Sequence, residues 1–239
     1  MGEIGSNSRA KKTSLILKNY FFYGRRRGPR LSLSKKLALE KILPLVKIDL
    51  QNINEKILKY KKNNKKIFLE IGFGSGENLI HLIDQNENSV FLGCEPYLNG
   101  LASFLKNLEK KDLDKVLIFD DDTRILFNKL NKNLINKIFI LYPDPWPKKR
   151  HYKRRLLTEA NLLMFGDALD KNGLIFIATD VKQYFEEIKK LFSFSKLFLI
   201  VNNPDFLIKP KILGQTNFER KAKKLLKNSY YLVVKKTSG

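Results

Sequence analysis

Seven short apolar runs recur along the chain, and they constrain its fold more than any other feature of the sequence. They read IFLEI from residue 67, VFLGC from 90, VLIF from 116, KIFIL from 137, LIFIA from 174, LFLIV near 197 and YYLVV from 230. Several are continuously apolar rather than alternating, as expected when helices cover both faces of a parallel sheet. The first five are separated by segments with helical periodicity. The sequence therefore predicts a doubly wound α/β fold with a mostly parallel, seven-stranded sheet.

The two ends of this pattern are less regular. The polar segment NNPDFLIKPKILGQTNFERK divides the last two runs, and mixed sheets of this kind commonly include an antiparallel final strand, which is expected here. A helical stretch is expected near residues 33–62. A second helix is expected to follow the basic run after residue 147 and to end near Asp170.

The N-terminal segment is basic and contains aromatic residues. From Arg9 to Lys36 there are ten Lys or Arg and no acidic residue, with Tyr20 to Tyr23 all aromatic and glycines and a proline breaking any long helix. A mobile cationic tail and an arm that stacks on RNA bases and contacts phosphates fit this pattern equally well. We therefore expect residues 1–36 to form a partly flexible arm and residues 37–239 to form the main domain.

The distribution of arginine favours nucleic acid as a partner. The formal net charge is +22, which suits a polyanion, although a biased genome composition also explains abundant lysine. Seven of the ten arginines lie in two short segments, and the guanidinium group is suited to phosphate. The residues expected to contact the phosphates of an RNA backbone are Arg25, Arg26, Arg27, Arg30, Arg150, Lys153, Arg154 and Arg155.

Several classes of site are excluded by the sequence. Cys94 is the only cysteine, and with only His81 and His151 beside it no metal cluster of plausible spacing is expected. No run of residues is long and apolar enough for a membrane span or a secretory leader. A cytoplasmic protein is expected, and no protein partner is evident.

A glycine-rich loop follows the first apolar run. Gly72, Gly74 and Gly76 form the pattern G-x-G-x-G, which lets the backbone approach a ligand closely. The dinucleotide fingerprint is instead G-x-G-x-x-G. Acidic Glu77 stands at the start of the next helix, where a phosphate would otherwise bind. The ligand is therefore expected to lack phosphate.

Carboxylates follow the other runs at the end where such folds bind ligands. Glu95 ends the second run and is suited to accept ribose hydroxyls. Asp120, Asp121 or Asp122 is placed to meet an adenine amino group, and another of the three is expected to cap the next helix. With Glu70 and Asp144 available for positive charge, a ribose, an adenine and no phosphate describe S-adenosylmethionine. We expect this cofactor.

The stretch YPDPWPKKRHYKRRLL holds Asp144 at the tip of the fourth run. Prolines at 143, 145 and 147 fix the backbone and stiffen the loop. One interpretation is that this stiff loop holds Asp144 in place for function. The simpler interpretation is a rigid turn that buries Trp146, and the two interpretations are compatible.

Five motifs together resemble one family. EIGFGSGE, GCEP, YPDPWPKKRHYKRRLL, ATD and TNFE occur in the order and spacing of the bacterial tRNA (guanine-N7)-methyltransferases, from about Asn19 to the end of the chain. The resemblance implies a Rossmann-like class I methyltransferase that acts on a guanine of the tRNA variable loop. It departs from the family at Asp122, where Ala is usual, and at Tyr152, where Asn is usual.

The resemblance also implies site residues. Asp144 would be the catalytic residue and lie beside the cofactor, with Glu70, Glu95 and Asp121 or Asp122 as cofactor carboxylates. The residues implied on the substrate side are Lys148, Asp180, Thr216, Asn217, Phe218 and Glu219. Asp180 is also explained as the N-cap of a helix.

Two other functions compete with this one. An enzyme that methylates exocyclic amines would carry Asn or Asp, two prolines and an aromatic residue at this strand tip, and the chain has Asp-Pro-Trp instead. A non-catalytic RNA-binding protein on a methyltransferase-like fold is the second alternative, and the intact glycines and carboxylates argue against it.

Overall fold

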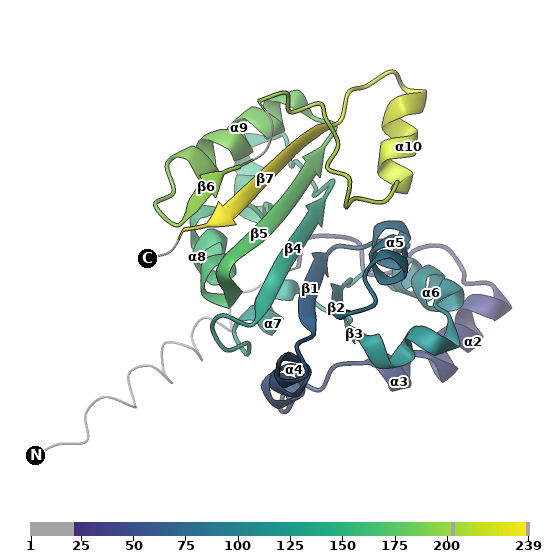
Figure 1. Ribbon diagram of the computed structural model, residues 1–239. Coiled ribbons are helices and arrows are strands. Elements are labelled where there is room, and N and C mark those ends of the chain that lie inside the picture. Colours follow the sequence, from purple (N-terminus) through teal and green to yellow (C-terminus); the bar gives the residue numbers. More distant parts are fainter. Residues whose placement is uncertain (1–21, 202–203, 238–239) are drawn as a thin grey trace, which may run out of the picture.

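The computed structural model describes residues 22–201 and 204–237, and its centre is a seven-stranded sheet (Figure 1). The strand order is β3-β2-β1-β4-β5-β7-β6. The strands are β1 (Lys66–Ile71), β2 (Ser89–Cys94), β3 (Val116–Phe119), β4 (Ile135–Leu141), β5 (Leu169–Thr179), β6 (Phe198–Ile200) and β7 (Tyr230–Lys236). Each expected apolar run forms one strand, so the predicted α/β sheet is confirmed.

The strand directions place a ligand crevice at the middle of the sheet. Strands β1 to β5 pair in parallel, whereas β7 is antiparallel to both β5 and β6. The expected antiparallel strand is thus confirmed. The strand order reverses between β1 and β4, so their carboxyl ends border the position where doubly wound folds bind ligands.

Helices cover both faces of the sheet. The helices are α2 (Leu33–Lys41), α3 (Leu43–Val46), α4 (Ile53–Lys62), α5 (Glu77–Gln85), α6 (Leu98–Asn107), α7 (Thr123–Phe127), α8 (Glu159–Ala168), α9 (Lys182–Ser193) and α10 (Asn217–Lys224). Along β1, Ile67 and Leu69 face the core cluster formed with α4, α7, α8 and α9, while Phe68 faces the cluster formed with α2, α3, α5 and α6. Both faces of the strand are buried, which explains its continuously apolar sequence. None of the helices in the described ranges is long and apolar enough to span a membrane.

Two expected helices are broken in the structure. The helical stretch expected near 33–62 consists of three helices: Pro44 is the second residue of the short α3, and Lys47, just after this helix, pairs with Ile118 of β3. The basic run forms a 3-10 helix over Lys149–Arg154 instead of entering a long helix. The chain is then extended until Thr158 caps α8, which ends at Ala168.

The described part of the N-terminal arm lies against the first turn of α6. The backbone nitrogen of Leu98 donates to the carbonyl oxygen of Arg26, and the side chain of Asn99 bonds to both Gly28 and Pro29. Tyr20 and Phe21 lie outside the described residues. Because α2 already begins at Leu33, the expected boundary at residue 36 falls inside a helix, and the division into arm and domain stays a prediction.

Candidate functional site

The glycine loop after β1 is open on one side and tightly packed on the other. Gly72, Gly74 and Gly76 have φ values of +70°, +58° and +82°, a region that side chains other than glycine rarely adopt. A Cβ atom added to Gly72 or Gly74 would meet nothing within 4 Å, whereas one on Gly76 would lie 2.3 Å from the ring of Phe104. The loop therefore packs against α6 through Gly76 and leaves open space beside the other two glycines.

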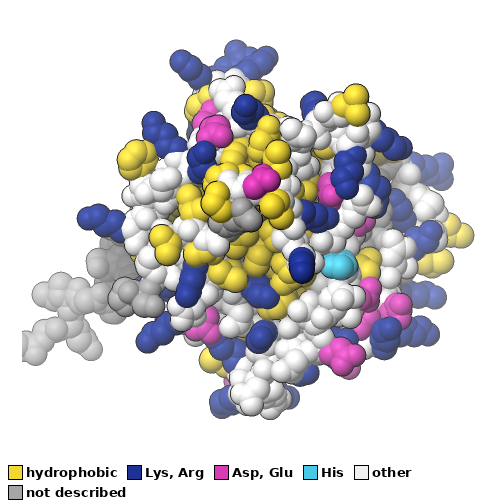
Figure 2. Space-filling view, turned by 45° about the horizontal axis from the view of Figure 1, so that its top comes forward, with side chains coloured by type: hydrophobic (Ala, Val, Ile, Leu, Met, Phe, Trp, Pro, Cys, Tyr) yellow, Lys and Arg dark blue, Asp and Glu magenta, His cyan; other side chains and the backbone are white. Residues whose placement is uncertain are grey.

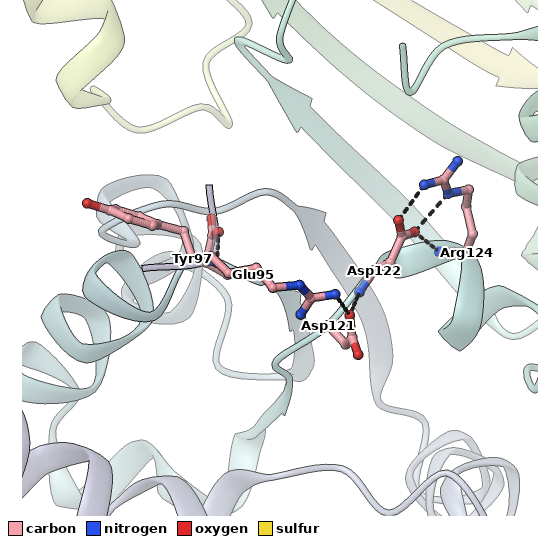
Figure 3. Close-up of polar contacts among 6 residues, drawn as sticks. Glu95, Tyr97, Asp121, Asp122 and Arg124 are labelled. Atoms are coloured by element: carbon pink, nitrogen blue, oxygen red, sulfur yellow. Dashed lines mark hydrogen bonds and ion pairs between the residues drawn. The ribbon is translucent and has the colours of Figure 1, made fainter. Parts of the chain in front are cut away.

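Glu95 ties this loop to the end of β2. Its Oε2 atom accepts a hydrogen bond from the backbone nitrogen of Gly74 at 2.6 Å. Its Oε1 atom accepts one from the backbone nitrogen of Tyr97 at 2.8 Å (Figure 3). The residue is buried, and burial raises the pKa of its carboxyl group, while these two hydrogen bonds act to lower it. Each oxygen keeps a lone pair, so the fixed carboxylate can still accept hydroxyl groups from a ligand.

The two aspartates after β3 have different partners. Asp122 is buried and caps α7: its Oδ1 atom accepts from the backbone nitrogen and the Nε atom of Arg124, both at 2.9 Å (Figure 3). Asp121 has an exposed side chain whose Oδ1 atom accepts from Arg26 at 2.6 Å. Of these two residues, Asp122 is the helix cap, which favours Asp121 for contact with a ligand.

Glu70, Glu95 and Asp144 are three acidic side chains with raised pKa values at neighbouring strand ends. Burial raises the pKa of Glu70 to about 8, with smaller contributions from Glu77 and Glu95. Asp144 is exposed to solvent, so only partial desolvation raises its pKa, and its charge contributes to raising the pKa of Glu95. Within residues 22–201 and 204–237, none of these three carboxylates forms an ion pair with a basic side chain. Raised pKa values caused by burial and like charge are a signature of functional sites.

The ligand that these carboxylates suit is an organic cation. In the described part of the chain, no group of three or more His, Cys, Asp or Glu side chains is arranged to hold a metal ion. Hydroxyl and ammonium groups, in contrast, each need only one or two carboxylate oxygens. The open glycine loop gives such a ligand access to the backbone.

Arg155 stabilises the loop that carries Asp144. The Nε atom of Arg155 donates to the carbonyl oxygen of Pro145 at 2.8 Å, and the guanidinium group also pairs with Glu187 and stacks 3.7 Å from the ring centre of Tyr152. Arg155 is buried, so its charge is already engaged. This differs from the expected contact with an RNA backbone, and the side chain instead positions the loop.

Exposed cations surround the crevice. Arg154 lies between the rings of Tyr23 and Trp146, at 5.0 and 4.9 Å from their centres, and so joins the arm to the Asp144 loop. Arg26 pairs with Asp121. The other expected backbone contacts are exposed side chains: Arg25, Arg27, Arg30, Arg150 and Lys153. Figure 2 shows Lys and Arg side chains round the face at the carboxyl ends of the strands, with hydrophobic atoms gathered between them.

The residues implied on the substrate side lie at separate positions round the same edge. Lys148 is exposed at the start of the 3-10 helix, and Asp180 follows β5. Asp180 is not a helix cap, because α9 begins after Val181 without a side-chain cap.

The last four of these residues begin α10. The Thr216 hydroxyl accepts from the backbone nitrogen of Glu219 at 3.0 Å and so caps the helix. Burial acts to raise the pKa of Glu219, but hydrogen bonds from Lys209 and Lys223 outweigh it and lower the pKa. Asn217 donates to Glu77, and Phe218 is exposed and stacks on Tyr142. Thr216 and Glu219 are buried at the start of α10, so the Thr216–Glu219 surface above α5 is formed by exposed Phe218 and half-buried Asn217 (Figure 1).

Two polar residues of the site were missed by sequence reasoning. Asn99 anchors the arm, and Asn78 bonds to Glu70 from the first turn of α5. Asn78 is four residues before buried Leu82 on the same helix face. A polar residue on the apolar face of a helix was the available signal.

Comparison with known proteins agrees with this architecture. Residues 64–232 match the model of a family described as putative methyltransferase. A tRNA (guanine-N(7)-)-methyltransferase of Agrobacterium fabrum is 38% identical over 165 residues, which cover 68% of this chain and 71% of the relative. The enzyme of the same name from a Chelativorans species is 41% identical over the same shares.

A solved structure described as an antibiotic related methyltransferase shares the fold. Its TM-score is 0.54 at 18% identity, with 80% of this chain and 95% of that one covered. The sheet order, the family model and the relatives lead to one conclusion. The chain belongs to the tRNA (guanine-N7)-methyltransferase family of S-adenosylmethionine-dependent enzymes.

Proposed function

We propose that this protein transfers the methyl group of S-adenosylmethionine to N7 of a guanine in the variable loop of tRNA, in the cytoplasm. The observation that carries the proposal is the carboxylate group Glu70, Glu95 and Asp144, which is unpaired with basic side chains in the described residues and has raised pKa values. A cationic cofactor favours the ionised form of these groups and balances its charge. An anionic dinucleotide would disfavour that form.

Each carboxylate contacts a different part of the cofactor. Glu95 accepts hydrogen bonds from the ribose hydroxyls while its own hydrogen bonds from Gly74 and Tyr97 hold it in place. Asp121 accepts from the adenine amino group, and Arg26 must leave it or move aside for this contact. Glu70 and Asp144 lie toward the positively charged methionyl part. The cofactor supplies an electrophilic methyl group on a sulfonium.

Methylation of N7 needs no general base. The N7 atom has a lone pair in the plane of the guanine ring, so no proton is removed before it attacks the methyl group. The protein holds the two reacting atoms in line and stabilises the positive charge that develops on the base. Asp144 supplies a fixed negative charge for this purpose, since Pro143, Pro145 and Arg155 restrict its loop.

The exposed cations position the tRNA. Arg25, Arg27 and Arg30 lie on the arm, and Arg150 and Lys153 lie beside the Asp144 loop. Contacts from these side chains to phosphates fix the position of the RNA without reading its sequence. Lys148, Asp180 and the Thr216–Glu219 surface are the candidates for contact with the target nucleotide.

A labelled methyl assay tests the proposal. Unmodified tRNA is incubated with the protein and cofactor labelled in its methyl group, and the product is located by chemical cleavage at 7-methylguanosine. The proposal predicts label at one guanine of the variable loop. Binding of tRNA and cofactor without any transfer would instead identify a non-catalytic RNA-binding protein, and label on an exocyclic amine would identify a different methyltransferase.

A further inference from the structure

A single side chain joins a cofactor carboxylate to the substrate side of the site. The Nδ2 atom of Asn78 donates to Oε2 of Glu70 at 3.0 Å, and its Oδ1 atom accepts from the backbone nitrogen of Gly214 at 2.9 Å. Asn78 is 1% exposed and Glu70 is 3% exposed. Both bonds are therefore shielded from water, where an unmade hydrogen bond costs most.

The orientation of the Asn78 amide is fixed by its neighbours. A backbone nitrogen can only donate, so Gly214 must face the amide oxygen, and the amide nitrogen must then face Glu70. The two hydrogen bonds therefore point the same way: Gly214 donates to Asn78, and Asn78 donates to Glu70.

The segment joined to Asn78 carries the substrate surface. Gly214 lies two residues before Thr216, and it packs so closely on α5 that an added Cβ would lie 2.6 Å from Cβ of His81. Asn217 donates to Glu77, the first residue of α5. Residues 209–219, which we call the docking segment, thus rest on the helix that begins at the glycine loop.

We propose that Asn78 is a positioning residue that couples cofactor binding to tRNA binding by linking Glu70 to the docking segment. The inference rests on the proposed function and extends it. When a cationic ligand lies beside Glu70, the carboxylate form is favoured and the hydrogen bond from Asn78 becomes charge-assisted. Polarisation of the amide then strengthens its bond to Gly214, so the Thr216–Glu219 surface is held more firmly for the tRNA.

Coupling of this kind is reciprocal and can be measured without catalysis. Calorimetry gives the affinity for S-adenosylhomocysteine with and without saturating unmodified tRNA, and the affinity for tRNA with and without S-adenosylhomocysteine. For the wild-type protein we expect each ligand to raise the affinity for the other about fivefold or more. A factor of one in a wild-type protein that methylates tRNA would overturn the inference and leave the proposed function standing.

Two variants test whether Asn78 couples the two binding sites or only packs against the docking segment. Asn78→Asp keeps an acceptor for Gly214 and nearly the same volume but replaces the amide donor with a carboxyl group. Its bond to Glu70 needs a proton shared between the two acids, which is lost when a cationic ligand ionises both. Asn78→Ala removes both bonds. In each variant the coupling factor should fall below about twofold, even where one affinity is nearly unchanged. Asn78→Asp is the deciding variant if Asn78→Ala unfolds.

The matched control is Asn86→Ala. Asn86 follows the same helix, and its side chain donates to the carbonyl oxygen of Leu82, so this variant should keep the wild-type factor. Retention of the wild-type factor by Asn78→Asp would show that the residue only packs the segment, and the inference would be wrong. Absence of methyl transfer by the wild-type protein would be a failure of the proposed function instead.

Discussion

The two sides of the crevice differ in the burial and the charge of their side chains. On the cofactor side, Glu70 and Glu95 are buried, carry no basic partner among the described residues and are held by hydrogen bonds from Asn78, Gly74 and Tyr97. On the tRNA side, cations such as Arg25 and Arg150 are exposed to solvent. One side is short of positive charge, and the other has an excess of it.

This difference separates two kinds of recognition. Buried carboxylates are weakly screened and geometrically fixed, so they suit a small cation that must be placed accurately. Exposed guanidinium and ammonium groups are screened by salt and suit a large polyanion whose position is averaged over many contacts. Arg26 joins the two sides, because it belongs to the arm and pairs with Asp121.

The largest expected effect concerns stability on the cofactor side. Glu70 has a pKa near 8 in the folded protein and an ordinary value of 4.5, so the folded state retains a proton that the unfolded chain releases. The free energy of unfolding therefore falls as pH rises from about 4.5 to 8. Glu70→Gln removes this loss, and its advantage in unfolding free energy over wild type should grow with pH to at most about 5 kcal/mol.

Thermal unfolding at pH 5.5 and pH 8 measures this change. Each kcal/mol corresponds to a shift of roughly 2–4 °C in a protein of this size. Glu87→Gln, at an exposed position, is the control and should show no such trend. A stability difference between Glu70→Gln and wild type that stays constant from pH 5.5 to 8 would mean that Glu70 is not buried as described.

The second prediction concerns catalysis at the junction of the two sides. Asp144→Asn keeps the shape of the side chain and removes its charge, and turnover should fall about 10²-fold or more, the scale for losing one preorganised electrostatic group. The affinity for tRNA should stay within about tenfold, since the exposed cations are unchanged. Single-turnover methylation with both ligands saturating is the measurement. A variant that reacts at the wild-type rate would reduce Asp144 to a part of the turn.

The third prediction concerns the ribose carboxylate. Glu95→Ala should weaken cofactor affinity by about one to two orders of magnitude, because a charged acceptor for hydroxyl groups is lost together with the bonds that hold Gly74 and Tyr97. Calorimetry measures the affinity, and the tRNA affinity without cofactor should not change. Equal cofactor affinity in both proteins would remove Glu95 from the site.

The smallest expected effect concerns the arm. Replacing Arg25, Arg27 and Arg30 with Ala should weaken tRNA binding about tenfold and lower the slope of log affinity against log salt by about two to three. The matched control replaces Lys56, Lys59 and Lys62, which are exposed on α4 (Figure 1) away from the carboxyl ends of the strands. Equal losses in the two triple variants would mean that overall charge, rather than the arm, binds the RNA.

The local parts of this design were predictable from the sequence. The continuous apolar runs indicated the strands because β1, β2 and β3 are buried on both faces, and the three glycines indicated the loop after β1. Only the structure showed that Asp122 rather than Asp121 caps α7, since both follow β3 and their side chains have different partners. Local sequence indicates an element and its end, but not which way each side chain turns.

Contacts between distant segments were not predictable in this way. Gly214 and Asn78 are 136 residues apart, and no local pattern relates them. Arg155 was expected on the surface with its basic neighbours, but Glu187 and the ring of Tyr152 bury its charge. The break at Lys47 has a similar cause, because pairing with Ile118 overrides helical propensity.

The central claim is that the carboxylates and the exposed cations bind two different ligands, and a salt titration of the wild-type protein tests it most directly. The affinities for cofactor and for unmodified tRNA are measured in parallel from 50 to 200 mM salt. We predict that tRNA affinity falls by about 10²-fold or more, as expected for several phosphate contacts, while cofactor affinity changes by less than about threefold. A cofactor affinity that falls as steeply as that of tRNA, or a tRNA affinity that does not respond to salt, would contradict the account.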